Sequence, residues 1–269
     1  MPSTTEDRSF YEGRWSKSDL SSGSLRNQVV RKERFFVHQL AGRQGHVLDL
    51  GCGGGWRLYT RVGPVVGVDL SHKSLLSARR IYDGAVLADL SVLPFATSSF
   101  DVVVSSDVLG HVPAADKDAV LAEIRRVLKP GGRTVHYVEA DGDDPLMRFA
   151  KRYPELYQRH VIGPEGHIGL ETPAQITARF RRMGLHAIAE IPAYRALTYV
   201  GRFVQYFDNE YAEKARVVRL MVATCKLCLK VHLVEMIANL LMSLLIEIGD
   251  RVLPERWAGG VLVCYEKQV

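Results

Sequence analysis

Cysteine is scarce in this chain of 269 residues, which has four: Cys52, Cys225, Cys228 and Cys264. Cys225 and Cys228 form a CxxC motif, but a tetrahedral zinc site needs a second pair or a histidine cluster, and neither follows in the sequence. The pair falls inside an apolar pattern of helical spacing, which favours two small buried side chains one turn apart. We therefore expect no metal site.

Three other features are lacking. The N-terminal stretch MPSTTEDRSFYEG has no apolar signal-peptide core, so a reducing cytoplasm is the expected location. The longest uncharged apolar run, MIANLLMSLLI, has 11 residues, well short of the ~20 that span a bilayer. The net charge is +5, but the basic residues stand in scattered pairs and form no block. Without a clustered basic groove with interleaved aromatics, no nucleic-acid partner is expected.

The chain does have a regular alternation of short β-branched runs and helical stretches. This alternation predicts right-handed crossovers and a mostly parallel sheet covered on both faces. Strands are expected at 46–50, 65–70, 85–89, 100–106, 133–139, 185–191 and 261–267. Helices are expected at 25–40, 55–61, 72–82, 115–128 and 173–183, with a Pro-Gly-Gly turn at 128–133, an irregular segment at 141–171 and a largely helical segment at 196–250.

A glycine-rich loop, in VLDLGCGGGW, follows the first predicted strand. The dinucleotide fingerprint needs glycine at the first, third and sixth positions, but counting from Gly51 the sixth position is Trp56. No P-loop motif is present either. Asp49 stands just before the loop and would repel a pyrophosphate docked on the backbone N–H groups there. The pattern favours a ligand that is cationic near the loop, such as a methionine amino group beside a sulfonium.

Five motifs in order resemble the class I S-adenosylmethionine-dependent methyltransferases of the "methyltransferase domain 11" type, a group that includes quinone-biosynthesis and natural-product enzymes. They are LDLGCGGGW, the acid that ends the second strand, AD before LPF, SFDVVVSSDVLGHV and LKPGGR, and they span residues 45–140. The resemblance implies an α/β fold: a Rossmann-like, doubly wound, seven-stranded sheet, mostly parallel with an antiparallel last strand, plus a helical insertion before that strand. It also implies S-adenosyl-L-methionine as cofactor and S-adenosyl-L-homocysteine as product.

The resemblance also implies roles for single residues. Asp49 would face the methionine amino group, Asp69 would accept hydrogen bonds from the ribose hydroxyls, and Asp89 would accept one from the adenine amino group. All three acids follow strands, at the edge where open α/β sheets bind ligands. The implied cofactor-binding residues are Asp49, Gly51, Cys52, Gly53, Asp69, Leu70, Asp89, Leu90 and Ser106.

Methyl transfer depends mainly on positioning and water exclusion, and a base matters only where the acceptor must lose a proton. His111, in DVLGHVP, is the first candidate for that base, and a role in ordering the loop is an equal alternative. His167, in GPEGHIG, is the second candidate. Tyr11 and Trp15 form an aromatic island in a polar N-terminus. They are predicted to cover the cofactor as a lid, with packing on the scaffold as the alternative.

Residues 233–248 carry a broad apolar helical stripe. Three interpretations stay open: a helical subdomain packed on the sheet edge, a homodimer interface, and an apolar lid that admits a lipid-like acceptor. Flanking cations suit peripheral contact with an anionic membrane. The predicted divisions are 1–24 as arm or lid, 25–140 as cofactor-binding core, 141–195 as acceptor-side segment and sixth strand, 196–259 as helical insertion, and 260–269 as last core strand.

The sequence therefore predicts methyl transfer from S-adenosylmethionine to a small-molecule acceptor of apolar character, at oxygen. Two alternatives remain open. One is methylation of a nucleic acid or protein, which the sequence pI of about 9.0 permits. The other is a catalytically idle protein that binds the cofactor.

Overall fold

The computed structural model describes Glu12, residues 27–195 and residues 199–268. Tyr11 and Trp15, the predicted lid, lie outside the described residues.

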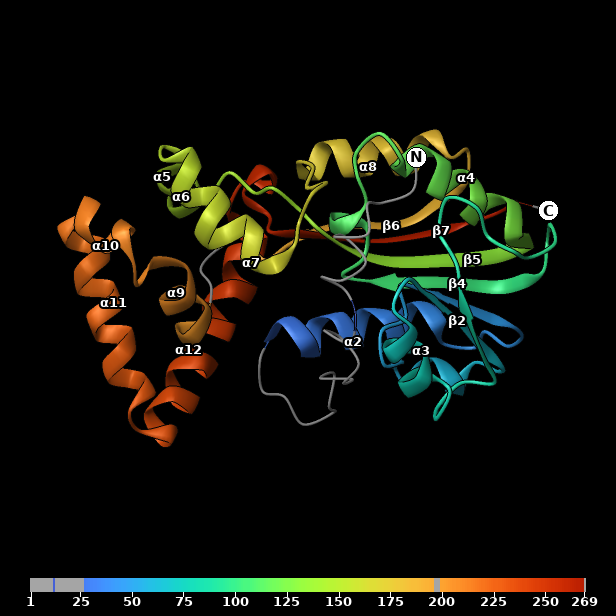
Figure 1. Cartoon of the computed structure of the whole chain (residues 1–269), viewed down its shortest axis with the longest axis horizontal. Coiled ribbons are helices and arrows are strands. Elements are labelled where there is room, and N and C mark those ends of the chain that lie inside the picture. The colour runs from blue at the N-terminus through green and yellow to red at the C-terminus, as the bar shows by residue number, and fades with distance from the viewer. Residues whose placement is uncertain (1–11, 13–26, 196–198, 269) are drawn as a thin grey trace.

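A seven-stranded sheet forms the centre of the molecule (Figure 1). Its spatial order is β3-β2-β1-β4-β5-β7-β6. The first five strands in the chain pair in parallel, and β7 is antiparallel to both of its neighbours, β5 and β6. This confirms the predicted fold class. The strands are β1 (Val47–Leu50), β2 (Val65–Asp69), β3 (Gly84–Leu87), β4 (Phe100–Ser106), β5 (Leu128–Glu139), β6 (His186–Ala193) and β7 (Gly260–Glu266).

Helices cover both faces of the sheet, and each face has its own apolar core. Helices α2 (Asn27–Leu40) and α3 (His72–Ala78) contribute to one core, while α4 (Lys117–Val127) and α8 (Pro173–Arg182) contribute to the other. Because successive strand residues point to opposite faces, Val102 and Val104 belong to the first core and Val103 to the second. Strands buried on both faces read as continuous β-branched runs, which is why the sequence revealed them.

Three local predictions were wrong. The helix expected at 55–61 is a single 3-10 turn, η1 (Tyr59–Arg61). There Trp56 and Tyr59 pack edge-on against each other and beside Phe36 of α2, which holds the chain against the core. The turn expected at 128–133 belongs to β5, because Leu128 pairs with Phe100 of β4.

The third wrong prediction is the irregular segment at 141–171, which is largely helical. It contains α5 (Pro145–Lys151), α6 (Pro154–Tyr157), the π-helical turn η3 (Gln158–Ile162) and α7 (Gly163–Glu165). The signal for α5 was present in the sequence, because Asp144 caps the N–H groups of Leu146 and Met147 and Pro145 occupies the first helical position.

Between β6 and β7 the chain forms α9 (Val200–Phe207), α10 (Glu210–Lys214), α11 (Arg216–Leu229), α12 (His232–Val252) and the 3-10 turn η4 (Glu255–Trp257). Together with 145–165, residues 200–252 make a helical lobe at one end of the sheet (Figure 1). The lobe has its own core, built around Phe207 and Tyr211. At its far end, α11 and α12 form a helical hairpin.

The C-terminal end of α12 ties this lobe to the sheet. Asp250 is buried, pairs with Arg31 of α2, and accepts the backbone N–H groups of Tyr194 (2.9 Å) and Arg195 (2.6 Å) just after β6. These bonds fix the direction of α12 relative to the sheet.

Candidate active site

The glycine-rich loop that follows β1 contains residues in the left-handed backbone conformation. Gly51 has a φ of +61° and Gly53 a φ of +50°, both unfavourable for residues with a Cβ atom. A Cβ atom on Gly51 would also lie 2.6 Å from a methyl group of Val108, which follows β4. The loop can therefore lie close to the end of β4 only with glycine at this position.

Alanine substitutions at Gly51 and Gly42 should distinguish the cost of backbone strain from the cost of a steric clash. Gly42 is the matched control. Gly42 has a φ of +72° and open space around its would-be Cβ, so Gly42→Ala should cost only the left-handed backbone penalty, about 1–2 kcal/mol. Gly51→Ala adds the collision with Val108 and should cost more. Urea unfolding of both variants measures the difference, and equal losses would contradict the close approach at Gly51.

Asp69, the last residue of β2, connects two loops. Its carboxylate accepts the backbone N–H groups of Gly53 and Ser71, each at 2.8 Å. Burial raises the pKa of Asp69 although these hydrogen bonds act in the opposite direction. A carboxylate has about four acceptor positions, so two remain for donors from a ligand.

Asp49 lies beneath the glycine loop and is 4% exposed. It accepts the hydroxyl of Tyr82 at 2.7 Å, and the backbone N–H of Trp56 donates to the same hydroxyl at 2.6 Å. Burial raises the pKa of Asp49 to about 7, Tyr82 offsets part of that rise, and the charge of Asp69 adds to it. Two neighbouring desolvated carboxylates are stabilised by a nearby cation, so this site suits a positively charged ligand.

The remaining predicted cofactor residues lie along the same edge of the sheet. The N–H of Ala88 donates to the carbonyl of Asp69 at 3.4 Å, which places Asp89 beside the end of β2. Asp89 is exposed, and its carboxylate accepts the N–H and hydroxyl of Ser91. Ser106 ends β4 and donates to Asp107 at 2.6 Å. Cys52 and Leu90 are buried, and Leu70 is half-buried directly after β2.

Asp107 is a strained residue that sequence reasoning missed. Its φ is +60°, which is uncommon for a residue with a side chain and often marks a functional constraint. Burial alone would raise the pKa of Asp107, but the Lys32 ammonium, with hydrogen bonds from Lys32 and Ser106, lowers it below its usual range. Lys32 also lies over the ring of Tyr137, 4.7 Å from its centroid. The charge pair joins α2 to the loop after β4.

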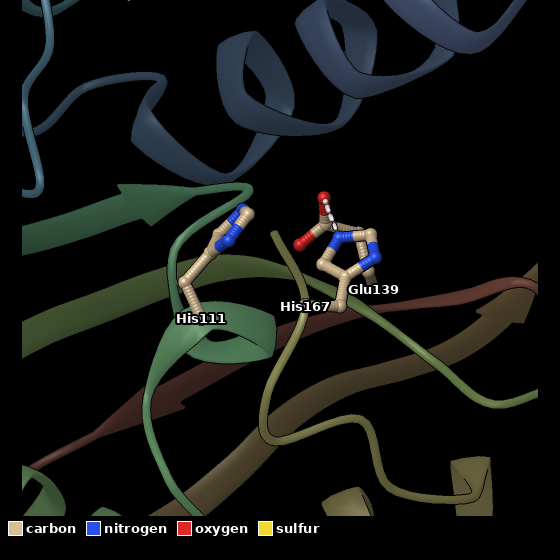
Figure 2. A group of neighbouring side chains, drawn as sticks. All are labelled: His111, Glu139 and His167. Carbon is tan, nitrogen blue, oxygen red and sulfur yellow. Dashed lines mark hydrogen bonds and ion pairs between the residues drawn. The ribbon is translucent and has the colours of Figure 1, made fainter. Parts of the chain in front are cut away.

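Both histidine candidates lie in one cluster with Glu139 (Figure 2). His111 ends the 3-10 turn η2 (Leu109–His111), Glu139 ends β5, and His167 follows α7. Nε2 of His167 lies 3.1 Å from Oε1 of Glu139, and the two imidazole rings are 4.8 Å apart. Since a carboxylate only accepts, Nε2 of His167 carries the hydrogen, and Nδ1 is the basic atom of the neutral ring.

Two glycines bring these loops together. The N–H of Gly169 donates to the carbonyl of Gly110 at 3.0 Å, and a Cβ atom on Gly169 would lie 1.8 Å from the carbonyl oxygen of Val112. The buried Lys117 adds a second tie, because its ammonium pairs with Glu171 at 2.9 Å and also donates to the carbonyl of Gly169. The turn that carries His167 is therefore fixed against the loop that carries His111.

A cavity of about 170 Å³ lies between the end of β5 and the helical lobe. Glu139 and His167 form part of its wall. Oε2 of Glu139 is buried and has no hydrogen-bond partner among the described residues, so a donor from a ligand would satisfy it. The rest of the lining is mainly aromatic or apolar, with two further carboxylates and one guanidinium: Tyr137, Tyr157, Tyr194, Tyr199, Tyr206, Ala140, Gly142, Leu146, Met147, Val161, Ile162, Leu170, Ile246, Gly259, Asp141, Asp144 and Arg202.

Glu139 also has a signal in the sequence, which the predicted site did not include. Glu139 ends the strand RTVHYVE, as Asp69 ends its own strand, so it is a further acid at the ligand-binding edge of the sheet. The expectation of no metal site also overlooked this cluster. One ligating atom from each of His111, Glu139 and His167 can be chosen so that all three lie within 4.8 Å of one another.

Comparison with known proteins agrees with this geometry. A profile of the methyltransferase domain family matches residues 48–136. The chain is 40% identical over 196 residues to a ubiquinone biosynthesis O-methyltransferase of Thiobacillus denitrificans, covering 66% of this chain and 79% of that protein. It is 36% identical over 185 residues to a demethylmenaquinone methyltransferase of Lactiplantibacillus plantarum, covering 59% and 77%. Among the curated relatives compared, the match spans from 30% to 79% of the relative's length.

Among solved structures, a Haemonchus contortus phosphoethanolamine N-methyltransferase 2 in complex with S-adenosyl-L-methionine matches with a TM-score of 0.55. The identity is 18%, and the match covers 89% of this chain and 53% of the other, so it supports the fold alone. The sequence relatives and the domain match show that the chain belongs to the methyltransferase family. It is an S-adenosylmethionine-dependent methyltransferase, and its carboxylate-lined glycine loop fits a ligand that carries an ammonium and a diol.

Cofactor affinity should depend on pH through Asp49. Only the ionised carboxylate attracts an ammonium, and with a pKa of about 7 Asp49 is mostly protonated at pH 6. The affinity for S-adenosylmethionine should therefore fall roughly tenfold between pH 7.5 and pH 6. Asp49→Asn should bind weakly with a flat profile. Calorimetric titration of both proteins tests this. A cofactor affinity that does not change with pH in the unaltered protein would show that the ammonium does not bind beside Asp49.

Proposed function

We propose that the protein methylates an oxygen atom of a small, apolar metabolite of the prenyl, polyketide or lipid-linked kind. The observation that carries this proposal is the cavity at the end of β5, where the Glu139–His167 pair lies in a largely aromatic and apolar lining that also includes Asp141, Asp144 and Arg202. Apolar walls bind the body of such an acceptor, and a few polar groups orient it. The relative named a ubiquinone biosynthesis O-methyltransferase supports the same acceptor class.

The size of the cavity limits what it can enclose. A cavity of about 150 Å³ accommodates a benzene molecule, so 170 Å³ holds about one substituted ring. Any longer tail would have to extend outside the cavity. The reactive hydroxyl would lie at the Glu139–His167 end, where the unpartnered Oε2 accepts a hydrogen bond.

S-adenosylmethionine supplies an electrophilic methyl group on a sulfonium. The protein's own residues contribute position and proton transfer. Asp49 and Asp69 would hold the donor at the ends of β1 and β2, and Nδ1 of His167 would take the proton that the acceptor oxygen loses when it receives the methyl group. Glu139 fixes the imidazole orientation and stabilises the imidazolium that results. His111, beside His167, is the second candidate for the base.

A cavity-filling substitution tests this location. Met147→Trp should cut methyl incorporation into extract acceptors at least roughly tenfold by occluding the site, while leaving S-adenosylmethionine affinity unchanged. Ile188→Trp, on the exposed side of β6, is the matched control. Full activity in Met147→Trp would show that the acceptor does not bind in this cavity.

A second chemistry for the same cluster is divalent-cation binding, favoured by the spacing of His111, Glu139 and His167. Two imidazoles and a carboxylate form a known ligand set, and a bound cation would acidify the acceptor hydroxyl directly. Dialysis against a chelator separates the two chemistries. The base mechanism predicts an unchanged rate, whereas a loss restored by added Mg²⁺, Mn²⁺ or Zn²⁺ would assign the cluster to a metal.

A further inference from the structure

The hairpin of α11 and α12 carries most of the exposed apolar side chains of the described protein. Of 22 exposed large hydrophobic residues, 14 lie between Val217 and Val252. Leu220, Leu227, Leu240 and Leu244 are each more than half exposed. Isolated exposed apolar residues are ordinary, but so many on one helical hairpin mark an interaction surface.

The α11 side of this hairpin is positively charged, whereas α12 carries three acids and one arginine. Residues 214–234 contain five cations, Lys214, Arg216, Arg219, Lys226 and Lys230, and no acidic residue. One of them, Lys226, is neutralised by Asp208 at 2.9 Å. Arg219 and Lys230 are exposed next to the apolar residues of the hairpin. An apolar face bordered by lysine and arginine is the composition of helices that lie in the interface of an anionic bilayer.

We propose that the outer face of α11 and α12 docks this methyltransferase on an anionic lipid bilayer. Charge favours this occupant over a second copy of the chain, because two copies that met through their basic α11 segments would repel each other across a symmetric interface. An anionic headgroup layer instead attracts each cation. The apolar side chains between the cations then enter the acyl boundary.

By length and composition α12 could cross a membrane, with 21 residues and an 18-residue window whose mean hydropathy is 1.5. The contacts that α12 makes with the rest of the protein are incompatible with a membrane-spanning helix. Asp250 is bonded to α2 and to the chain after β6, Ile246 is buried at the wall of the cavity, and Asn239 accepts the N–H of Val200 at 3.3 Å. A spanning helix would have to give up all of these contacts. The helix therefore lies along the membrane surface with its C-terminal half held by the protein.

This docking extends the proposed function by placing the enzyme at a membrane. Its biological purpose rests on that proposed function. Ile246 lines the cavity, whereas Leu244 and Leu245 on the same helix are exposed. One helix thus separates the bilayer from the acceptor cavity. A ring held in the cavity could leave its apolar tail in the membrane, so the structure favours acceptors that reside in lipid.

Vesicle co-sedimentation of the full chain tests the docking, with no cofactor or acceptor present. Vesicles of phosphatidylcholine mixed with phosphatidylglycerol should bind roughly tenfold or more protein than pure phosphatidylcholine vesicles, and added salt should release it. Leu240→Glu/Leu244→Glu should abolish binding. Arg219→Glu/Lys230→Glu should remove the preference for anionic vesicles. Ile188→Glu, an exposed apolar residue on β6, should bind like the unaltered protein.

Each contrary outcome rejects the proposal in a distinct way. No binding to either vesicle, with a dimer that Leu240→Glu/Leu244→Glu dissociates, would assign the face to a second copy. Protein that resists alkaline carbonate extraction would assign α12 to a spanning role. Because methyl transfer is not measured in this experiment, a negative result removes the docking and leaves the proposed function standing. Cofactor affinity of every variant confirms that the core is folded.

Discussion

Asp69→Ala should weaken S-adenosylmethionine binding by two to four orders of magnitude. The carboxylate is expected to accept both ribose hydroxyls, and charge-assisted hydrogen bonds are worth about 1.5–3 kcal/mol each. The substitution also removes the acceptor that joins Gly53 to Ser71, so the glycine loop loses its support from β2. Both effects act in the same direction, and calorimetric titration measures their sum.

Asp101→Asn is the matched control for this experiment. Asp101 also accepts a backbone N–H, that of His46 at 2.8 Å, but it lies at the start of β4, at the opposite edge of the sheet. Its substitution should leave cofactor affinity unchanged. Near-normal binding by Asp69→Ala would show that the ribose lies elsewhere, and equal losses in both variants would indicate a general effect on stability.

His167→Ala should lower kcat for methyl transfer by about 10²–10⁴-fold, the range that a positioned general base contributes. Cofactor affinity should not change, because His167 belongs to the acceptor cavity and not to the glycine loop. Glu139→Gln should give a smaller loss, since the carboxylate that orients the imidazole and stabilises the imidazolium is gone.

His160→Ala serves as the control for His167→Ala. His160 also pairs with a glutamate, Glu210, at 2.6 Å, but on the helical lobe, and it is not one of the residues that line the cavity. It should retain kcat within about twofold, since a substitution away from the site touches no reacting group. A fully active His167→Ala would exclude His167 as the base and leave His111 as the remaining candidate.

The strands of the sheet could be predicted because the burial of each strand determines the residue pattern of that strand alone. Strands such as FDVVVSS are buried on both faces, so each is a continuous β-branched run whatever its neighbours are. The acids Asp49 and Asp69 could be predicted for a related reason. Parallel strands place their carboxyl ends along one edge, so acids near those ends must gather there.

The acceptor side could not be derived in this way, because its contacts join segments far apart in the chain. Glu139 meets His167 because Glu171 pairs with the chain directly after β5, at Ala140 and Asp141, while Gly169 bonds to Gly110. No spacing rule encodes these ties. The sequence singled out His111 and His167 separately but contained nothing that would pair either with Glu139.

The helical lobe presented a different difficulty. Its apolar stripe was visible in the sequence, but an apolar helix can face a core, a partner or a lipid with the same pattern. Only the fold shows that Ile246 is buried while Leu240 and Leu244 are exposed. Tertiary contacts therefore determine which apolar residues of the helix pack in a core and which lie on an exposed surface.

The most direct test of the account is methyl transfer itself. Purified protein is incubated with methyl-labelled S-adenosylmethionine and a cell extract, and the products are divided between organic and aqueous phases. The account predicts label in the organic phase, lost in His167→Ala and in Asp69→Ala. Label in the aqueous phase would contradict an apolar acceptor, and tight cofactor binding with no label transferred to any acceptor would contradict methyl transfer as the protein's function.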